Sequence, residues 1–164
     1  MINQNYLKIV SFTGYGFASG LPYVLIFITL TAWLRDVDID LSLIGFISWI
    51  MLTYSLKFLW APLVDRSPTK LFKSFGHRRS WIVLMQVLIL ISLILWSFVN
   101  PTQNLPLVIT IGLMIAIASA TQDITVDALR IEQIGENEGK SMAAGAAMAV
   151  VGWWTGYKLG GVIS

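Results

Sequence analysis

The chain alternates between long apolar stretches and short polar connections. A helix needs roughly 20 mostly apolar residues to cross the hydrocarbon core of a bilayer, since each residue rises about 1.5 Å. A membrane-spanning strand would instead alternate apolar and polar side chains over about 10 positions, and these unbroken stretches do not. The pattern therefore predicts an all-α membrane protein with about five transmembrane helices, at about residues 9–34, 42–64, 80–99, 106–129 and 141–163.

Composition agrees with lipid as the main solvent of these helices. Of the 164 residues, 56% are hydrophobic and 12% are charged, whereas a soluble domain carries about 25% charged residues. The formal net charge of +2 is too small to indicate a nucleic-acid partner. The chain contains no cysteine, so it offers no thiolate nucleophile and no disulfide. The lipid bilayer is therefore the first expected partner.

The basic residues gather in one connection and set the expected orientation. The segment between the second and third stretches contains the basic residues Arg66, Lys70, Lys73, Arg78 and Arg79. Short basic connections are retained on the cytoplasmic side of a membrane. We therefore expect a multi-pass protein whose amino terminus is cytoplasmic and whose fifth stretch ends outside.

The same connection begins with an acidic residue at the end of the second stretch. Asp65 and Arg66 are followed by Gly76, Arg78 and Arg79 where the third stretch begins. This arrangement resembles the signature between the second and third helices of major facilitator transporters. An ion pair between Asp65 and the basic cluster would stabilise one state of a gate. Alternatively, these charges only fix the topology of the connection.

Two charged residues within the apolar stretches, Lys57 and Asp123, are expected at the same depth in the membrane. Lys57 precedes Asp65, near the end of the second stretch, by eight positions. Asp123 likewise precedes Arg130 by seven positions. At about 1.5 Å per residue, both lie about 10 Å inside the cytoplasmic boundary, where a lysine and an aspartate are expected to pair. We therefore predict an ion pair between Lys57 and Asp123, direct or bridged by Gln122. Alternatively, Lys57 extends to the headgroups on its long side chain.

A second carboxylate lies near the end of the fourth stretch. Asp127 follows Asp123 by four positions, so the two share one face of a helix. Because Asp127 is close to the interface, it is either a structural group, solvated or paired with Arg130, or part of a proton path.

A second lysine lies deep in the fifth stretch. Lys158 either faces a polar cavity, where it would bind an anionic solute, or extends outward to the headgroups. Trp153, Trp154 and Tyr157 share its helix, and their rings either pack between helices or stack on a sugar. Both interpretations stay open for each group.

Small residues mark the first and fifth stretches as sites of close helix contact. Gly152, Gly156 and Gly160 recur every fourth residue in the fifth stretch, and Gly16, Gly20 and Pro22 interrupt the first. Glycine lets two helix backbones approach closely, whereas proline removes a donor and kinks its helix. A broken helix of this kind either lines a transport cavity or only packs tightly.

Several sequence blocks together resemble the AmpG-type permeases of the major facilitator superfamily. The blocks are GFASGLP (16–22), KFLWAPLVDR (57–66), RRSW (78–81), QDITVDA (122–128) and GYKLG (156–160). The resemblance implies an N-terminal helical bundle, and import of anhydro-muropeptides across the bacterial inner membrane with protons as the driving ion. Related acetyl-coenzyme A transporters are the alternative, because they share similar blocks around the second and fourth helices.

The length of the chain departs from that family. A major facilitator has two six-helix bundles, so residues 1–164 are interpreted as a single, incomplete N-terminal half. Transport would then require a missing C-terminal half or a second polypeptide, with protons and a small anionic sugar-peptide as further partners. The alternative is a membrane remnant that acts only in helix association. We find no nucleophile with its base and no metal-ligand cluster, so no enzyme activity, metal or cofactor is expected.

Overall fold

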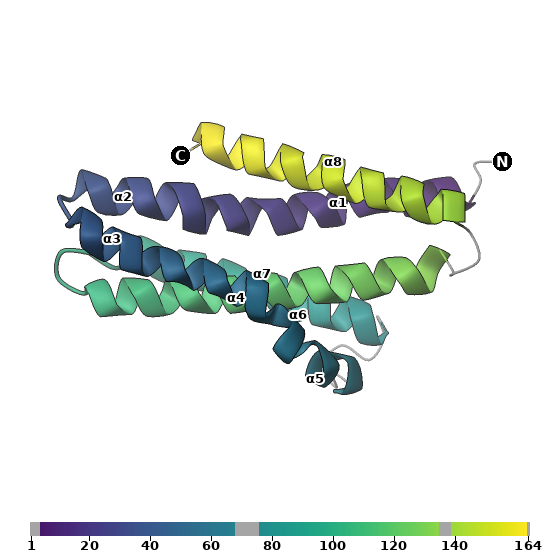
Figure 1. The fold of residues 1–164 in the computed structure, drawn as a ribbon, viewed down its shortest axis with the longest axis horizontal. Helices are drawn as coiled ribbons and strands as arrows, with labels where there is room; N and C mark the ends of the chain where they lie inside the picture. Colours follow the sequence, from purple (N-terminus) through teal and green to yellow (C-terminus); the bar gives the residue numbers. More distant parts are fainter. Residues whose placement is uncertain (1–3, 68–75, 135–138, 164) are drawn as a thin grey trace.

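The computed structural model describes residues 4–67, 76–134 and 139–163, and all regular structure in these ranges is helical (Figure 1). Within them, four stretches are long and apolar enough to cross a membrane: Val10–Asp36, Leu41–Leu59, His77–Ser97 and Leu105–Gln133. The predicted class, an all-α membrane protein, is therefore confirmed.

The first of these stretches is one long rod with a change of helix type. It consists of α1 (Gln4–Val24), the π-helix η1 (Leu25–Thr29) and α2 (Leu30–Asp36). Pro22 lies inside α1, and the wider π-helical turns begin just after it. Proline lacks a backbone donor, so the carbonyl of Ala18, four residues earlier, loses its helical partner.

The second stretch is broken, although the sequence predicts one continuous helix over 42–64. It consists of α3 (Leu41–Ile47), the 3-10 helix η2 (Ser48–Met51), α4 (Leu52–Leu56), the 3-10 helix η3 (Lys57–Leu59) and α5 (Ala61–Arg66). Pro62 stands in the first turn of α5 and cannot donate to the carbonyl four residues earlier, at Phe58. The break at η3 therefore turns α5 away from the axis of α4, as Figure 1 shows.

The remaining helices are long and uninterrupted. They are α6 (His77–Ser97), α7 (Leu105–Ile134) and α8 (Gly139–Ile163). Helix α8 falls in the predicted fifth stretch but is not among the four that are apolar enough to span, because glycines, aromatic residues and Lys158 reduce its hydropathy. A membrane crossing by α8 therefore stays a prediction.

The helices pack in two layers. Helix α8 lies along α1 and runs in the same direction, while α6 and the segments of the second stretch lie against α7 (Figure 1). Contact between α1 and α7 joins the layers. Helix α7 is consequently the centre of the bundle, and its buried residues include the polar side chains Ser119, Thr121, Gln122 and Thr125.

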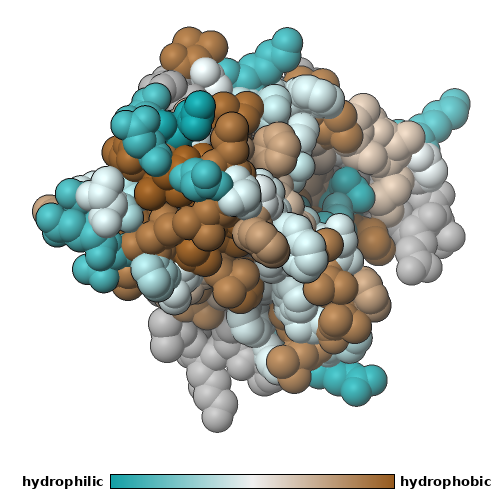
Figure 2. All heavy atoms as spheres, turned by 60° about the vertical axis from the view of Figure 1, so that its left-hand side comes forward, coloured by the Kyte–Doolittle hydropathy of each residue, from teal (hydrophilic) through white to brown (hydrophobic). Residues whose placement is uncertain are grey.

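An apolar core fills the half of the bundle that contains α2 and α3, and apolar side chains also cover much of the surface. Leu30, Ile44, Ile89 and Ile115 meet in that core. Phe98 is 83% exposed, and Figure 2 shows hydrophobic side chains spread broadly over one face of the molecule. Water would disfavour such a surface, whereas lipid is its natural solvent.

The contact between α1 and α8 is made by glycines from both helices. A Cβ added to Gly16 or Gly20 would overlap the carbonyl oxygen of Ala149 or Trp153 on α8. In the opposite direction, a Cβ on Gly152 or Gly156 would overlap a carbonyl oxygen of α1, at Thr13 and Phe17 respectively, and one on Gly160 would overlap the side chain of Val24. The predicted glycine repeat thus lies where the two backbones touch, which is the contact that small residues permit in membranes.

Candidate functional site

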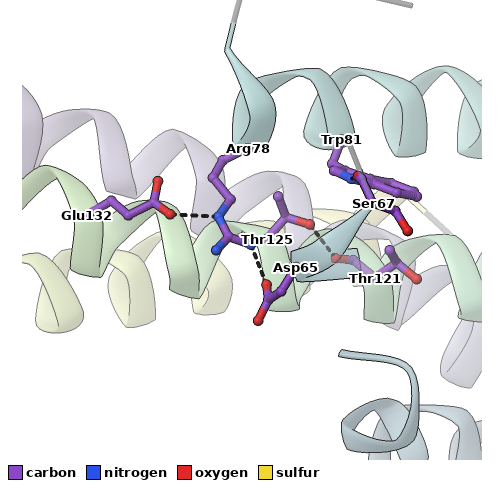
Figure 3. Close-up of polar contacts among 7 residues, drawn as sticks. All are labelled: Asp65, Ser67, Arg78, Trp81, Thr121, Thr125 and Glu132. Atoms are coloured by element: carbon purple, nitrogen blue, oxygen red, sulfur yellow. Dashed lines mark hydrogen bonds and ion pairs between the residues drawn. The ribbon is translucent and has the colours of Figure 1, made fainter. Parts of the chain in front are cut away.

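An ion-pair network joins α5, α6 and α7 at one end of the bundle. Arg78 pairs with Asp65 at the end of α5, and its Nε lies 2.8 Å from the Glu132 carboxylate near the end of α7 (Figure 3). Asp65 and Glu132 are about half exposed, while Arg78 is mostly buried. One guanidinium thus connects three helices, because its planar group offers several donors at once.

Two tryptophans hold α5 in its tilted position. The Trp60 Nε1 donates to Thr121 Oγ1 on α7 at 3.1 Å, and the Trp81 Nε1 on α6 donates to the Ser67 carbonyl at 3.0 Å. Both indole groups thereby satisfy their single donor at the boundary of the bundle. The segment that carries Asp65 is therefore fixed from two sides.

The other residues of the predicted gate, Gly76, Arg66 and Arg79, lie in different local environments. Gly76 is the N-cap of α6 and has a φ of 81°, a left-handed conformation that glycine adopts without strain. Arg66 and Arg79 are exposed, and Arg79 lines a cavity between α6 and α1. Lys70 and Lys73 lie outside the described residues.

The structure brings Lys57 and Asp123 together within the bundle. Lys57 Nζ lies 3.6 Å from Asp123 Oδ2, and their side chains are 34% and 22% exposed. Lys57 reaches Asp123 from η3, the segment where the second stretch is broken. The separation is that of an ion pair, slightly beyond a direct hydrogen bond, so the break in the helix and the charge pair coincide.

A cavity of about 190 Å³ surrounds this pair. Its walls come from α1, α7, α8 and η3, and include Ser19 and Trp153. Asp127 and Arg130 also line it and pair with each other at 3.1 Å. The cavity thus contains two cations and two anions, which balance within a segment where an isolated charge would be costly.

Gln122 does not bridge the pair. It is fully buried, and neither its amide nitrogen nor its amide oxygen has a hydrogen-bond partner among the described residues. It lines a different cavity, between α1 and α6. Sequence reasoning placed Gln122 beside Asp123, but adjacent residues on a helix point about 100° apart, so the two amino acids serve different surfaces.

Lys158 lies on an exposed face of α8. Its neighbours there are Val151, Trp154 and Leu159, which line one shallow depression with it. This face is turned away from the glycines that contact α1. Lys158 does not line the cavity around Asp123, and its predicted contact with a solute would require a further surface opposite α8.

Aromatic residues from three stretches meet beside that cavity. The ring centroid of Tyr23 lies 5.3 Å from that of Tyr54 and 5.4 Å from that of Trp153. Trp153 in turn stacks on Tyr157 at 5.4 Å with an interplanar angle of 11°. The cluster ties α1, α4 and α8 together, and it places an aromatic wall next to the Lys57 to Asp123 pair.

The sequence alone does not predict two contacts at the candidate site, those made by Glu132 and Tyr54. Glu132 is not among the predicted site residues, although it lies on the same helix as Asp127, near the end of α7. Tyr54 was also overlooked, because an isolated tyrosine in an apolar stretch has no spacing signal. Both contacts join residues on different helices, so they depend on the tertiary structure.

Several apolar helices long enough to cross a membrane, with charge pairs between them at the wall of a cavity, define a multi-pass membrane protein. The family model described as acetyl-coenzyme A transporter 1 matches residues 4–163, and the chain belongs to that family.

Named relatives refine this assignment. The chain is 40% identical over 149 residues to the anhydromuropeptide permease of Escherichia coli (strain K12), a match covering 91% of this chain and 28% of the permease. It is 37% identical over 149 residues to the putative transporter AmpG 4 of Rickettsia conorii, covering 91% of this chain and 34% of that protein. An uncharacterized protein of Haemophilus influenzae is 47% identical over 133 residues, a match covering 80% of this chain and 30% of that protein.

These matches confirm the resemblance to AmpG-type permeases that the sequence blocks indicated. They also show that the chain spans between 28% and 34% of the length of these relatives. The chain is therefore similar to one part of a longer transporter.

Proposed function

We propose that the chain forms most of one helical bundle of a proton-coupled importer of anhydro-muropeptides in the bacterial inner membrane. The observation that carries the proposal is the ion pair of Lys57 with Asp123 in a cavity between membrane-spanning helices. Charges at this depth are costly and are characteristic of ion or solute paths. The named permease among the relatives supports the choice of solute.

The pair offers a simple way to couple a proton to a solute. Protonation of an Asp123 carboxylate oxygen would neutralise it and release the Lys57 ammonium from its partner. The free ammonium would then attract an anionic group of the solute, and return of the solute to water would favour deprotonation. Because Lys57 belongs to the broken segment η3, its release would also loosen α5 from α7.

The network around Arg78 supplies the matching gate. Asp65 and Glu132 belong to different helices, and Arg78 holds both of them. In this proposal the network stabilises one state of the bundle at its cytoplasmic mouth and separates in the other. The orientation is part of the proposal, since it follows from the positive charge of the same connection.

The aromatic cluster favours a sugar-containing solute over acetyl-coenzyme A. Trp153 lines the cavity and stacks on Tyr157, and an aromatic face offers a broad apolar surface to a sugar ring. Acetyl-coenzyme A remains the second candidate because of the description of the family model. Named curated relatives favour the muropeptide.

Uptake into sealed membrane vesicles tests the proposal. We expect labelled anhydro-muropeptide to accumulate with an imposed proton gradient when this chain is joined to the remainder of a related permease, and not with the chain alone. Asp123→Asn should abolish the dependence on the gradient, while Asp36→Asn, at the end of α2, should not. Accumulation of acetyl-coenzyme A instead would replace the proposed solute.

A different class of function is favoured by the glycine contact between α1 and α8. If the chain acts only as a membrane remnant that associates with other helices, no solute would accumulate in either form. Because Gly16 and Gly152 hold α1 against α8 within the chain, bulky residues there would weaken association by disrupting that helix pair, while Asp123→Asn would have no effect on it. The two candidates therefore differ in which substitution matters.

A further inference from the structure

Three hydroxyl groups approach Asp123 from different helices. Ser19 on α1 lines the cavity that contains Asp123 and is close enough to interact with it. Ser119 precedes Asp123 by one turn of α7, so the two share a face of that helix. Tyr54 lies on α4, which packs against α7, and its hydroxyl is close enough to interact with Ser119 and Asp123. We call Ser19, Tyr54 and Ser119 the hydroxyl cluster.

The hydroxyl cluster is buried, and its hydrogen bonds are incomplete. Ser119 is fully buried, Ser19 is 5% exposed, and the oxygen of the Tyr54 hydroxyl is also inaccessible. None of the three oxygens makes a hydrogen bond of ordinary geometry to another described residue. A buried hydroxyl without a partner is costly, and buried water is the usual partner where about two to four polar groups meet.

The cavity beside Asp123 has room for water. Its volume is about 190 Å³, and one water molecule takes about 30 Å³. The other charged groups at its wall are Lys57, Asp127 and Arg130, and the described parts of α1 and α8 add none. Tyr54 is a further titratable group near the carboxylate. Water in this cavity would therefore meet both the charged groups and the hydroxyl cluster.

Asp123 separates two different polar regions along α7. Ser119 lies one turn toward the start of α7, at the end of the bundle that contains α2 and α3 (Figure 1). Asp127 and Arg130 lie one and two turns in the other direction and form an ion pair with each other. The carboxylate therefore has neutral hydroxyl groups on one side and charged groups on the other.

We propose that the hydroxyl cluster binds ordered water against Asp123, and that this hydrated route delivers a proton to the carboxylate from the end of the bundle that contains α2 and α3. The route rests on the proposed function, because it specifies how the proton of that mechanism reaches Asp123. Each hydroxyl or water accepts a proton on an oxygen lone pair as it gives up its own to the next oxygen. The last O–H bond forms on a carboxylate oxygen of Asp123, which is the one group of the route whose charge changes.

Radiolytic labelling tests the water site on this chain in lipid nanodiscs, without any transport. X-rays convert bound water into hydroxyl radicals, which oxidise the nearest reactive side chain, here Tyr54. Ser119→Ala removes one hydrogen bond of the bound water, so it should lower the oxidation of Tyr54 about three- to tenfold. Ser92→Ala is the matched control, because Ser92 on α6 is also buried without a partner among the described residues but does not line the cavity. Equal oxidation of Tyr54 in the two variants would overturn the water site.

Two modes of uptake test the proton route in the chain joined to the remainder of a related permease. Uptake driven by a proton gradient requires proton delivery to Asp123, whereas exchange of labelled for unlabelled anhydro-muropeptide at equal pH requires no net proton movement. Tyr54→Phe keeps the ring and removes the hydroxyl, so it should slow gradient-driven uptake about tenfold and exchange by less than about twofold. Equal slowing of both modes would give Tyr54 a structural role and overturn the route. Ser92→Ala again serves as the control.

Failure of the proposed function and failure of the hydrated route give different results. If the proposed function is wrong, the joined transporter without substitutions shows no gradient-driven uptake, and the proton route is refuted with it, whatever the labelling shows. If the transporter works but the oxidation of Tyr54 does not respond to Ser119→Ala, the hydroxyls are bonded directly to their neighbours. The hydrated route alone is then refuted.

Discussion

The bundle is held together differently at two of its contacts. Between α1 and α8, glycines bring two backbones together without any charged group, and added atoms would overlap main-chain oxygens. Around η3, α5 and the end of α7, by contrast, the contacts are charge pairs and indole hydrogen bonds. Close packing has essentially one arrangement, whereas charge pairs can exchange partners, protons or water. The first contact is therefore suited to a rigid unit and the second to a moving one.

The largest effect is expected from filling the glycine contact. Gly16→Val should destabilise the folded bundle by about 3 kcal/mol, because the new atoms meet the Ala149 backbone rather than a flexible side chain. Gly14→Val on the same helix is the matched control, since a Cβ there meets nothing within 4 Å. Thermal unfolding in detergent, followed by circular dichroism, compares them. Equal losses for the two variants would show that α1 and α8 are not rigidly packed.

A smaller loss should follow from removing one member of the central pair. Asp123→Ala leaves Lys57 without its partner, and we expect a cost of about 1–2 kcal/mol, reduced from that of a fully buried pair because both side chains are partly exposed. The double variant Lys57→Met with Asp123→Leu should recover most of the loss. A double-mutant cycle of Lys57→Met, Asp123→Leu and their combination, measured by thermal unfolding, gives the coupling energy. A value near zero would mean that the pair does not form.

The network at Arg78 should contribute less and should respond to salt. Arg78→Gln is expected to cost about 0.5–1 kcal/mol at low ionic strength, since both carboxylates are about half exposed. The loss should shrink in about 1 M salt, where screening acts over about 3 Å. Arg79→Gln, which lies one position away and is exposed, serves as the control in the same unfolding measurement. A loss independent of salt would indicate packing rather than charge.

The smallest effect is expected at the connection between α2 and α3, where Asp40 caps α3. The Ser42 hydroxyl and then its backbone N–H donate to the carboxylate and lower the pKa of Asp40. A lowered folded pKa means that the stabilisation is present above the unfolded pKa of about 4 and is lost as pH falls through the lower folded value.

Asp40→Ala should therefore flatten the loss of α3 stability below about pH 4, and Asp36→Ala should not. Hydrogen exchange of the α3 amides at several pH values measures this difference. If the stability of α3 depended on pH in the same way in both variants, the Asp40 cap would be excluded as the source of that dependence.

Much of the candidate site could be anticipated from depth along the chain. Lys57 and Asp123 were placed at one level by counting residues from the cytoplasmic boundary, because a helix converts residue number into height. Counting cannot give the direction of a side chain around its helix. Gln122 was therefore expected at the pair but lies at another surface, and Lys158 was considered for the cavity but lies on the outer face of α8.

The breaks in the helices were only partly predictable. Pro22 indicated an irregular first helix, and η1 follows it. For the second stretch the sequence predicts one continuous helix over 42–64, although Pro62 stands within it. The 3-10 segment that presents Lys57 depends on Trp60 and Thr121 holding α5 against α7. Those contacts join residues distant in the sequence.

The sequence by itself determined the lipid environment, the helical class and the relative depth of the charged groups along their helices. The reason is that apolar length and residue spacing are local properties of each stretch. Only the tertiary structure decided which helices touch, that Arg78 joins Asp65 to Glu132, and that α1 has an open flank beside α6. The physical reason is that contacts between helices depend on their rotation and crossing, which are fixed by packing of the whole bundle rather than by any one stretch.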